Sequence, residues 1–298
     1  MRRAALPESS GYALATMKII AVTNIKGGVG KTTTAVNLAY LAATAGANTL
    51  LWDLDAQGAA TYSLQAEITE RVSARKLVSG KREAPEAVVP TAYERLHVLP
   101  ADLSYRNIDL HLAERRRPTE RLLRMSRSLR GTYDVLMLDC PPGISLLTEN
   151  VLRAADALVV PLLPTPLSIR MLIQLRDFIA REGWTDLTVL PFFSMVDRRR
   201  ALHRELIAST RVEFPGVLAT EVPYWSDIER MSVRRAPLPA LAPHGPATAL
   251  YVSLWCEIAA RLDLPKLPEA PAENAAPAAP SVVAKLDRSK GPPPGPIH

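Results

Sequence analysis

Apolar residues along this chain gather into short runs, and longer segments with helical periodicity separate these runs. Several runs are apolar at every position instead of alternating with polar residues, which is typical of strands buried on both faces of a parallel sheet. The pattern predicts strands at 18–23, 49–54, 96–99, 134–138, 157–162, 187–195 and 217–222. It predicts helices at about 31–45, 119–130, 145–154, 167–182, 200–212 and 245–262. We therefore expect an α/β fold, with a doubly wound, mostly parallel sheet and helices on both faces.

Three regions lack this alternation. Residues 62–95 are polar and have no clear period, and we expect loops and short helices there, over one edge of the sheet. Residues 1–16 precede Met17, which opens directly into the first strand, so we expect a disordered leader, with a misassigned start codon or a functional arm as alternatives. The Pro/Ala-rich segment 264–298 cannot bury enough apolar surface to order itself, and we expect a disordered tail. The predicted folded domain is therefore 17–263.

Composition narrows the class of protein. The chain has 298 residues, of which 48% are hydrophobic and 5% aromatic, and this suits an aliphatic core. No run approaches 18 apolar residues, and polar residues follow Arg2 and Arg3 where a signal peptide needs an apolar stretch, so we expect a cytoplasmic protein. The two cysteines, Cys140 and Cys256, form neither a disulfide framework nor a metal-type spacing. The net charge of +6 is compatible with a nucleic-acid partner, although solvated surface accounts for such an excess more often.

The most informative segment lies between the first predicted strand and the first predicted helix. It consists of Lys26, Gly27, Gly28, Val29, Gly30, Lys31, Thr32 and Thr33. Glycines let backbone N–H groups converge on a phosphate, and the helix N-terminus adds its positive end. A lysine at the position of Lys31 reaches the β- and γ-phosphates, and the hydroxyl of Thr32 can ligate Mg²⁺. We therefore predict that this segment binds ATP together with Mg²⁺.

Carboxylates close two other predicted strands. Asp53 and Asp55 end the second strand and lie on the same side of it by period-two alternation. Asp139 ends an apolar strand, which is a Walker B arrangement where the carboxylate holds Mg²⁺ through water. Ligands of open parallel sheets bind at the carboxyl ends of the strands, so we expect these side chains beside the phosphate loop. A pair of strand-end aspartates that cap helices or form turns is the alternative.

Taken together, the three motifs resemble the ParA/MinD family of deviant Walker A ATPases, and the resemblance spans roughly residues 17–262. Its mark is Lys26, which precedes the paired glycines, while Ile25 stands where an ordinary phosphate loop has its first glycine. The resemblance implies an ATP-dependent homodimer in which Lys26 reaches the partner's ATP, and it implies that Asp55 orients the attacking water. The catalytic residues expected from it are Lys26, Lys31 and Asp55, and the expected Mg²⁺ ligands are Thr32 and Asp139.

Within the family, the segment from Asp139 through Cys140 to Pro142 resembles the ParA-type, Soj-like partition proteins. Gly143 follows where serine is commoner. Ala56 replaces the proline of the family's Asp-x-Asp-Pro-Gln-Gly, and we expect this to alter the stiffness of the loop rather than its chemistry. Cys140 is expected to be a small buried residue, not a nucleophile.

Arginines in the C-terminal third suggest that the binding partner is DNA. Arg199, Arg234 and Arg235 fall where ParA-type proteins carry arginines that bind DNA without sequence preference. Residues 196–235 hold eight arginines against six acids, so ordinary solvated helix faces are the alternative. A second strip at i+3 spacing, for which a solvated face is favoured, consists of Arg121, Arg124, Arg127 and Arg130.

The resemblance implies a switch ATPase that positions DNA or another cargo and that hydrolyses ATP slowly until a partner stimulates it. The expected partners are a second copy of the chain, DNA, and a ParB-like or cargo adaptor protein, with no membrane, so the protein is expected to be nucleoid-associated in the cytoplasm. The main alternative is a MinD-like membrane-associated ATPase, which is disfavoured because the Pro-rich end cannot form an amphipathic helix. Two kinds of enzyme on the same fold are further alternatives. One is an iron–sulfur reductase, which needs two cysteine ligands per subunit, and Cys256 lies where that family has none. The other is an amide-forming or phosphotransferase enzyme.

Overall fold

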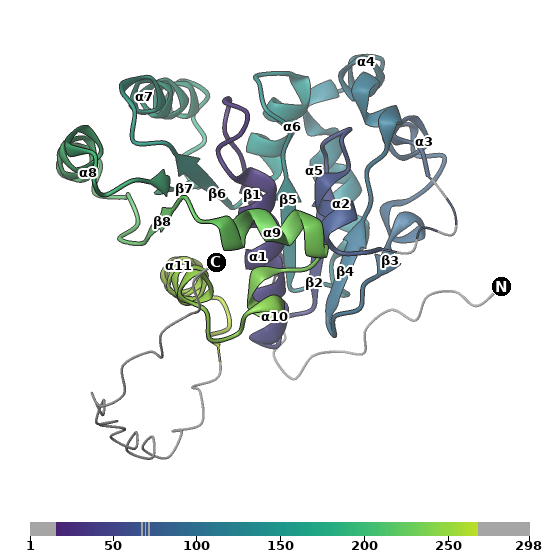
Figure 1. The fold of residues 1–298 in the computed structure, drawn as a ribbon. Helices are drawn as coiled ribbons and strands as arrows, with labels where there is room; N and C mark the ends of the chain where they lie inside the picture. Colours follow the sequence, from purple (N-terminus) through teal and green to yellow (C-terminus); the bar gives the residue numbers. More distant parts are fainter. Residues whose placement is uncertain (1–15, 67, 69, 71, 268–298) are drawn as a thin grey trace, which may run out of the picture. The chain divides into compact units, whose positions relative to one another are not determined.

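The sheet has eight strands in the order β3-β4-β2-β5-β1-β6-β7-β8 (Figure 1). The computed structural model describes residues 16–66, 68, 70 and 72–267. The strands are β1 Lys18–Val22, β2 Thr49–Asp53, β3 Val89–Pro90, β4 Leu96–Leu99, β5 Val135–Asp139, β6 Ala157–Leu162, β7 Thr188–Val196 and β8 Glu221–Pro223. All neighbouring strands are parallel except the pair β3–β4. The predicted doubly wound, mostly parallel sheet is therefore confirmed.

Residues of the central strands alternate between two hydrophobic cores, one on each face of the sheet. In β1, Ile19 and Ala21 belong to one core, whereas Ile20 and Val22 belong to the other. Every position of β2, β5 and β6 is buried for the same reason. Burial on both faces explains why these strands are apolar at nearly every position.

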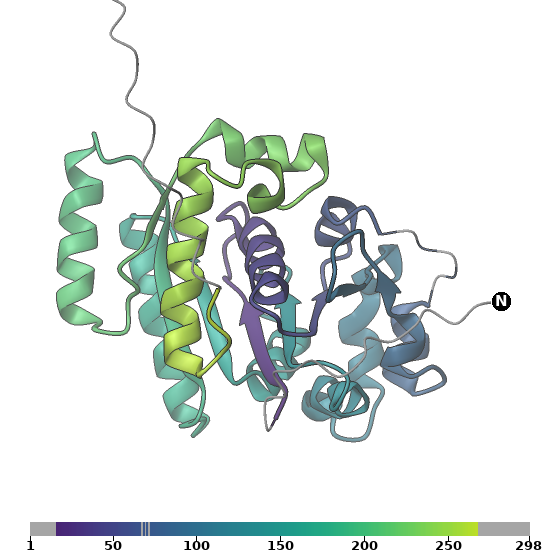
Figure 2. The ribbon, with the colours of Figure 1, turned by 90° about the horizontal axis from the view of Figure 1, so that it is seen from below.

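Helices cover both faces (Figure 2). One face carries α1 Lys31–Thr44, α2 Ala59–Ser63, α9 Ser226–Arg234, α10 Leu238–Leu241 and α11 Pro246–Leu262. Of these, α1 and α11 lie side by side. The other face carries α3 Ala74–Ser79, α4 Ile108–Ala113, α5 Arg121–Ser126, α6 Leu146–Ala154, α7 Pro166–Arg181 and α8 Ala201–Glu213. Short 3₁₀ turns are η1 Ala84–Ala87, η2 Leu103–Asn107, η3 Pro118–Glu120 and η4 Arg127–Leu129.

The last strand is shorter than the predicted 217–222, and this part of the prediction was wrong. Glu257 of α11 is the physical reason. Its carboxylate accepts the backbone N–H groups of Ala219 at 2.6 Å and Thr220 at 2.8 Å, so these groups do not pair with β7. The strand consequently begins only at Glu221.

The helix predicted at 119–130 is broken into η3, α5 and η4. Serine hydroxyls return to the backbone within this segment: Ser126 Oγ donates to Leu123 O at 2.9 Å, and Ser128 Oγ donates to Met125 O at 3.0 Å. Such bonds compete with the regular helical pattern and favour tight turns. The apolar spacing therefore located the element correctly but overestimated its regularity.

The sequence pattern missed the short elements β3, α4, α9 and α10. Helix α9 presents only Ile228, which is half-buried, and Met231, which is buried, to the core, so its apolar face is too narrow for the sequence pattern to stand out. The described residues of 62–95 consist mostly of loops and short helices, as predicted, and β3 adds an antiparallel edge strand there.

The predicted leader, 1–16, and the predicted tail, 264–298, lie outside the described residues apart from Thr16 and 264–267. Leu264 is buried in the core, and Leu267 packs against it, so the structured unit continues to 267. Within the described ranges, no helix combines the length and the apolarity needed to cross a membrane.

Candidate functional site

The carboxyl ends of β1, β2 and β5 meet at one edge of the sheet, where the loop 23–30 leads from β1 into α1. In the sheet register, Asp139 lies between Val22 of β1 and Asp53 of β2. The three segments that the sequence singled out are thereby brought together. They lie at the position where open parallel sheets bind ligands.

The loop adopts a conformation that depends on two glycines. Gly28 has φ +69° and Gly30 has φ +90°, and both values belong to the left-handed region. Gly30 also precedes the first turn of α1, and a Cβ at this position would lie 3.3 Å from Ser194 Oγ of β7. Side chains are therefore disfavoured here for both backbone and packing reasons. Val29, between these glycines, is fully buried and anchors the loop to the interior.

Asn24 braces the loop, and sequence analysis missed it. Its Oδ1 accepts the N–H of Lys26 at 3.0 Å, and its Nδ2 donates to Pro161 O of β6 at 2.7 Å. The N–H of Gly143, after β5, donates to Ile25 O at 3.0 Å. The only sequence signal was a polar residue directly after a buried strand, which does not reveal what it binds.

Lys31 is buried but is paired only with a neutral group. Its side chain is 7% exposed, and Nζ donates to the carbonyl of Lys26 at 3.0 Å. Burial lowers the pKa of Lys31, while the nearby Asp139, Cys140 and Asp55 act in the opposite direction. An ammonium group held by a carbonyl in this way can exchange that contact for a charged oxygen at little cost.

Asp139 is the least satisfied charged group of the site. It is fully buried, and neither carboxylate oxygen has a hydrogen-bond partner among the described residues. Burial raises the pKa of Asp139 well above its usual value, and Asp53 and Asp55 raise it further, while Thr32 and Lys31 oppose the shift. A buried carboxylate without partners is costly unless a cation accompanies it.

Asp53 is also buried, but it has internal partners. Its Oδ2 accepts Thr61 N at 2.9 Å and Thr61 Oγ1 at 2.8 Å, and its Oδ1 accepts Asp55 N at 3.1 Å. Burial raises the pKa of Asp53 to about 6, despite these hydrogen bonds. Asp53 therefore fixes the start of the following loop and α2, while Asp55 lies beyond the strand end and is half-buried.

The loop after Asp55 closes without the proline that Ala56 replaces. Asp55 Oδ1 accepts Gln57 N at 3.0 Å, and Gly58 N donates to Asp55 O at 2.9 Å. Gly58, at φ +63°, then starts α2. The course of this loop is therefore set by hydrogen bonds of Asp53 and Asp55 and by the left-handed backbone of Gly58, and no proline is needed.

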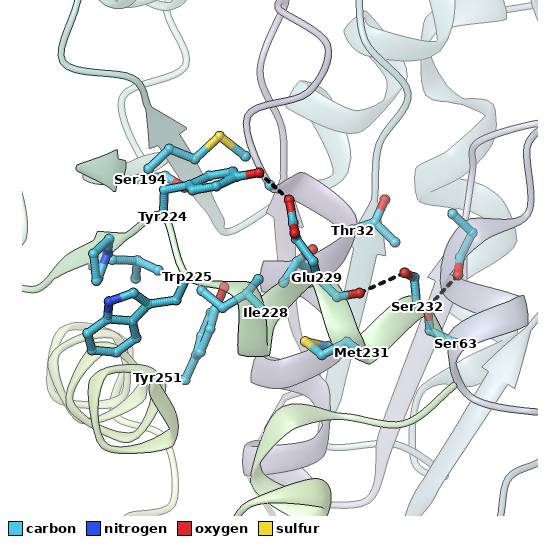
Figure 3. Close-up of a pocket in the computed structure, with 16 residues that line it drawn as sticks. Thr32, Ser63, Ser194, Tyr224, Trp225, Ile228, Glu229, Met231, Ser232 and Tyr251 are labelled. Atoms are coloured by element: carbon cyan, nitrogen blue, oxygen red, sulfur yellow. Dashed lines mark hydrogen bonds between the residues drawn. The ribbon is translucent and has the colours of Figure 1, made fainter. Parts of the chain in front are cut away.

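A cavity of about 280 Å³, which we call the first cavity, opens beside the N-terminus of α1 (Figure 3). Gly30, Thr32 and Thr33 belong to its lining. Ser63 of α2 lies on one side of it, and Tyr224 and Trp225 lie on the other. Helix α9 contributes Ile228, Glu229, Met231 and Ser232 to its wall. Sequence analysis did not find this wall, since its residues come from segments without a motif. The only signal was the aromatic pair directly after β8.

A second cavity of about 550 Å³ lies on the other side of the loop, between α6 and α7. Its lining includes Asn24, Ile144 and Phe178. Its lining lacks Gly30, Thr32 and Thr33, which line the first cavity, so of the two cavities only the first adjoins the start of α1.

The predicted DNA-binding arginines occupy three different environments. Arg199 is exposed and forms a bidentate ion pair with Asp197, at 2.9 and 3.0 Å. Arg234 is exposed on α9, and its side chain makes no hydrogen bond or ion pair within the described part of the chain. Arg235 is half-buried, with its guanidinium 4.3 Å from the ring centre of Tyr62. The charges at these positions are therefore not equally free to meet a phosphate.

Two further expectations concern residues away from this surface. Cys140 is buried, and burial raises the pKa of its thiol, which fits an interior packing role. In the strip 121–130, Arg121 donates Nε to Val78 O at 2.6 Å, and Arg124 pairs with Glu120 at 3.4 Å. Arg121 thus holds α5 to α3, while Arg124, Arg127 and Arg130 are exposed.

The arrangement fits a nucleotide with Mg²⁺. Within the described residues, no group of three or more His, Cys, Asp or Glu side chains is arranged to hold a metal ion alone. Mg²⁺ does not require such a group, because it is usually held by one or two protein oxygens together with substrate phosphates and waters. The unpartnered carboxylate of Asp139 and the hydroxyl of Thr32 provide oxygens of that kind.

Comparison with known proteins agrees with this geometry. A family model described as an AAA domain matches residues 17–182. The chain is 31% identical to the sporulation initiation inhibitor protein Soj of Bacillus subtilis, over 82% of this chain and 98% of that protein. It is 33% identical to the chromosome partitioning protein ParA of Caulobacter vibrioides, over 66% of this chain and 77% of that protein. A solved structure named cobyrinic acid a,c-diamide synthase, from Mycobacterium smegmatis with a bound ATP analogue and magnesium, superimposes with a TM-score of 0.69 at 27% identity, covering 86% of this chain and 100% of that one.

Proposed function

This chain belongs to the ParA/Soj family of P-loop partition ATPases, and we propose that it is an ATP-dependent dimerising switch that holds DNA and positions DNA or another cargo. The proposal covers ATP and Mg²⁺ as ligands, a second copy of the chain as partner, and stimulation of hydrolysis by a ParB-like or cargo adaptor protein. The place of action would be the nucleoid in the cytoplasm.

One observation carries the proposal: Asp139 is fully buried without a hydrogen-bond partner, at the same sheet edge as Lys31. Lys31 donates only to a carbonyl, and the carboxyl oxygens of Asp139 have no hydrogen-bond partner among the described residues. A triphosphate with a divalent cation complements both, since Lys31 can bind phosphate oxygens while Asp139 and Thr32 face the cation. The backbone N–H groups of residues 27–33 and the N-terminus of α1 would bind the phosphates. The nucleoside would then extend into the first cavity.

The chemistry follows from positioning and electrostatics, which dominate phosphoryl transfer. Mg²⁺, when bound, neutralises charge on the β- and γ-phosphates. Asp55, whose backbone N–H donates to Asp53 Oδ1, would orient the attacking water. Lys26 is the second positive charge, supplied to the partner's nucleotide, so turnover would require the dimer. ATP binding would then assemble the dimer, and hydrolysis would release it.

DNA binding is the part of the proposal that depends most on the family. Arg199, Arg234 and Arg235 are the proposed contacts, and Arg234 is the most available of them. Because each arginine would occur twice in a dimer, modest local charge could still give useful affinity.

The dimer mechanism is tested with Asp55→Ala and Lys26→Ala, using size-exclusion chromatography with light scattering and a phosphate-release assay. Asp55→Ala is expected to bind ATP and accumulate as a dimer, whereas Lys26→Ala is expected to bind ATP as a monomer without turnover. Lys81→Ala, which removes an exposed lysine after α3, is the control and should behave as wild type. Normal dimerisation and turnover by Lys26→Ala would rule out the trans-lysine mechanism.

A second candidate function is an amide-forming enzyme, because one solved neighbour carries the name of a diamide synthase. The two functions differ in what hydrolysis requires. A switch ATPase releases phosphate from ATP without a small-molecule acceptor, and DNA or a partner protein changes its rate. Phosphate release that depends strictly on a carboxylate acceptor and an amide donor would favour the synthase instead.

A further inference from the structure

Arg235 makes three contacts that its neighbours on α9 do not make. Its Nε donates to Tyr62 O at 3.2 Å, and its guanidinium lies 4.3 Å from the Tyr62 ring centre. Gln65 completes the set, because its Nε2 donates to Arg235 O at 2.7 Å. We call these three residues the Arg235 clasp. Both Arg235, at φ +52°, and Gln65, at φ +50°, hold left-handed backbone conformations, which are unfavourable for such side chains unless their surroundings impose them.

The clasp joins two helices that face each other across the first cavity. Helix α2 lines the cavity with Ala59 and Ser63, and α9 lines it with Met231 and Ser232 among others. Arg235 follows α9 directly, and Gln65 comes just after α2. The contacts therefore hold the cavity walls together at one end.

The two helices are not equally well anchored. Thr61 of α2 is bound twice by Asp53, so α2 is fixed to the strand end that carries the Asp55 loop. Helix α9 buries only Met231, which contacts Asn37 of α1 through sulfur at 3.3 Å. Segments with so little apolar burial open at low cost, so polar contacts decide where such a helix lies.

We propose that Arg235 is a positioning residue for the nucleotide, which holds α9 against α2 and so keeps the first cavity closed around the nucleoside. The inference rests on the proposed function, because it requires ATP in this site. It also withdraws Arg235 from the DNA contacts proposed above, whereas Arg234, which has no side-chain partner among the described residues, stays among them. The reason is that the guanidinium of Arg235 stacks on the Tyr62 ring and donates its Nε–H to Tyr62 O, so it is less available to a DNA phosphate. Arg234, which does not contact Tyr62, cannot take over this stacking role.

The experiment compares Mg-ATP with Mg-tripolyphosphate in titration calorimetry. Tripolyphosphate meets only the phosphate loop, whereas ATP also fills the first cavity. Arg235→Ala is expected to weaken ATP binding by about five- to twentyfold, because a cation–π contact and a charge-assisted hydrogen bond are lost. Its affinity for tripolyphosphate should stay within about twofold of wild type. Arg230→Ala, which removes an exposed arginine of α9 that pairs with Asp227, is the matched control and should change neither affinity.

A double-mutant cycle with Tyr62→Leu separates the clasp from independent effects. Arg235→Ala in the Tyr62→Leu background should weaken ATP binding much less than in wild type, since the partner is already absent. Gln65→Ala removes only one hydrogen bond and leaves the guanidinium in place, so it should give a smaller loss of the same kind. This milder variant keeps the test available if Arg235→Ala folds poorly in a thermal-unfolding control.

Three results would overturn the inference. Equal loss of ATP and tripolyphosphate affinity would indicate general damage to the fold, and unchanged ATP affinity would indicate that the clasp does not act on the nucleotide. A flatter salt dependence of DNA binding for Arg235→Ala at saturating ATP, equal to that of Arg234→Ala, would return Arg235 to the DNA surface. If the wild-type chain binds neither Mg-ATP nor Mg-tripolyphosphate, the proposed function is wrong, and the inference fails with it. If the wild-type chain binds both and the Arg235→Ala result is one of those above, only the inference is wrong.

Discussion

Charged groups are arranged differently at the carboxyl edge of β1, β2 and β5 and on the surface of α8 and α9. At the carboxyl ends of these strands, Lys31 is buried and donates only to a neutral carbonyl, and Asp139 is buried without a hydrogen-bond partner among the described residues. On the surface, Arg199 is exposed and already paired with Asp197. Buried unmatched charge is expensive for the folded chain, and a ligand that supplies the missing partner gains that energy back on binding. We therefore expect the strand ends to bind their ligand specifically, and we expect binding at the arginine surface to be weaker and salt-sensitive.

Removing the unmatched lysine should give the largest effect. Lys31→Ala is expected to weaken ATP binding by at least about 100-fold, because it deletes the charged contact to the phosphates. Calorimetry with Mg-ATP measures this, with Lys81→Ala as the exposed-lysine control. If Lys31→Ala binds ATP within threefold of wild type, the edge is not the nucleotide site and the contrast above has no functional meaning.

Removing the unmatched carboxylate should separate stability from ligand binding. Asp139→Asn is expected to raise the thermal midpoint of the nucleotide-free chain, by about 2–4 °C for each kcal/mol relieved, since it removes a buried charge. The same variant should lose the gain in ATP affinity that Mg²⁺ provides. Asp134, at the other end of β5, accepts Asn48 N at 2.8 Å, so Asp134→Asn should not raise the midpoint. A lower midpoint for Asp139→Asn would mean that this carboxylate has a partner in solution.

The pH dependence of the free energy of unfolding tests the environment of Asp53, at the carboxyl end of β2. The pKa of Asp53 is raised from 3.8 to about 6 in the folded chain, so the folded state holds a proton between these values that the unfolded state lacks. The contribution of Asp53 to the free energy of unfolding is therefore greatest below about pH 3.8, and it is lost as the pH rises through about 6. Denaturant unfolding at several pH values should show the wild-type free energy of unfolding falling relative to Asp53→Asn by roughly 1–3 kcal/mol from acid to neutral pH. A pH-independent difference between the two proteins would show that Asp53 is not protonated in this range.

The smallest effects are expected on the arginine surface. Arg199→Ala should remove about two phosphate contacts per dimer and flatten the slope of log K against log salt by roughly 2, equally on two unrelated duplexes. Asp197→Asn frees Arg199 from its ion pair and should strengthen DNA binding by about two- to fivefold. Both are measured with ATP under non-hydrolysing conditions. An unchanged slope for Arg199→Ala would move the DNA surface elsewhere, with the strip 121–130 as the next place to test.

Sequence reasoning succeeded where structure follows from adjacent residues. The central strands could be predicted because burial on both faces leaves a continuous apolar run, and the β1–α1 loop could be located because its glycines and lysine are contiguous. The strand-end aspartates could be placed together because parallel strands end at one edge. These are local patterns with a single geometric solution.

The parts that escaped prediction depend on partners distant in sequence. Nothing near Ala219 announces that Glu257 will take its N–H, and nothing distinguishes Arg235 from Arg234 until Tyr62 is placed beside it. The wall of the first cavity is assembled from α2, β7, β8 and α9, none of which carries a motif. Which of several similar side chains makes a given contact depends on tertiary packing, so the contacts of single surface residues are the hardest to predict from sequence.

The two ends of the strand order limit how copies of this chain can meet. The outer strands are β3, which is two residues long and ends at Pro90, and β8, which is three residues long and ends at Pro223. Proline cannot donate to a further strand, and strands this short offer few free backbone groups, so neither side of the sheet is a template for strand addition. Polymerisation through edge-to-edge β-pairing is therefore disfavoured, and any self-association of this chain must use a surface other than its outer strands.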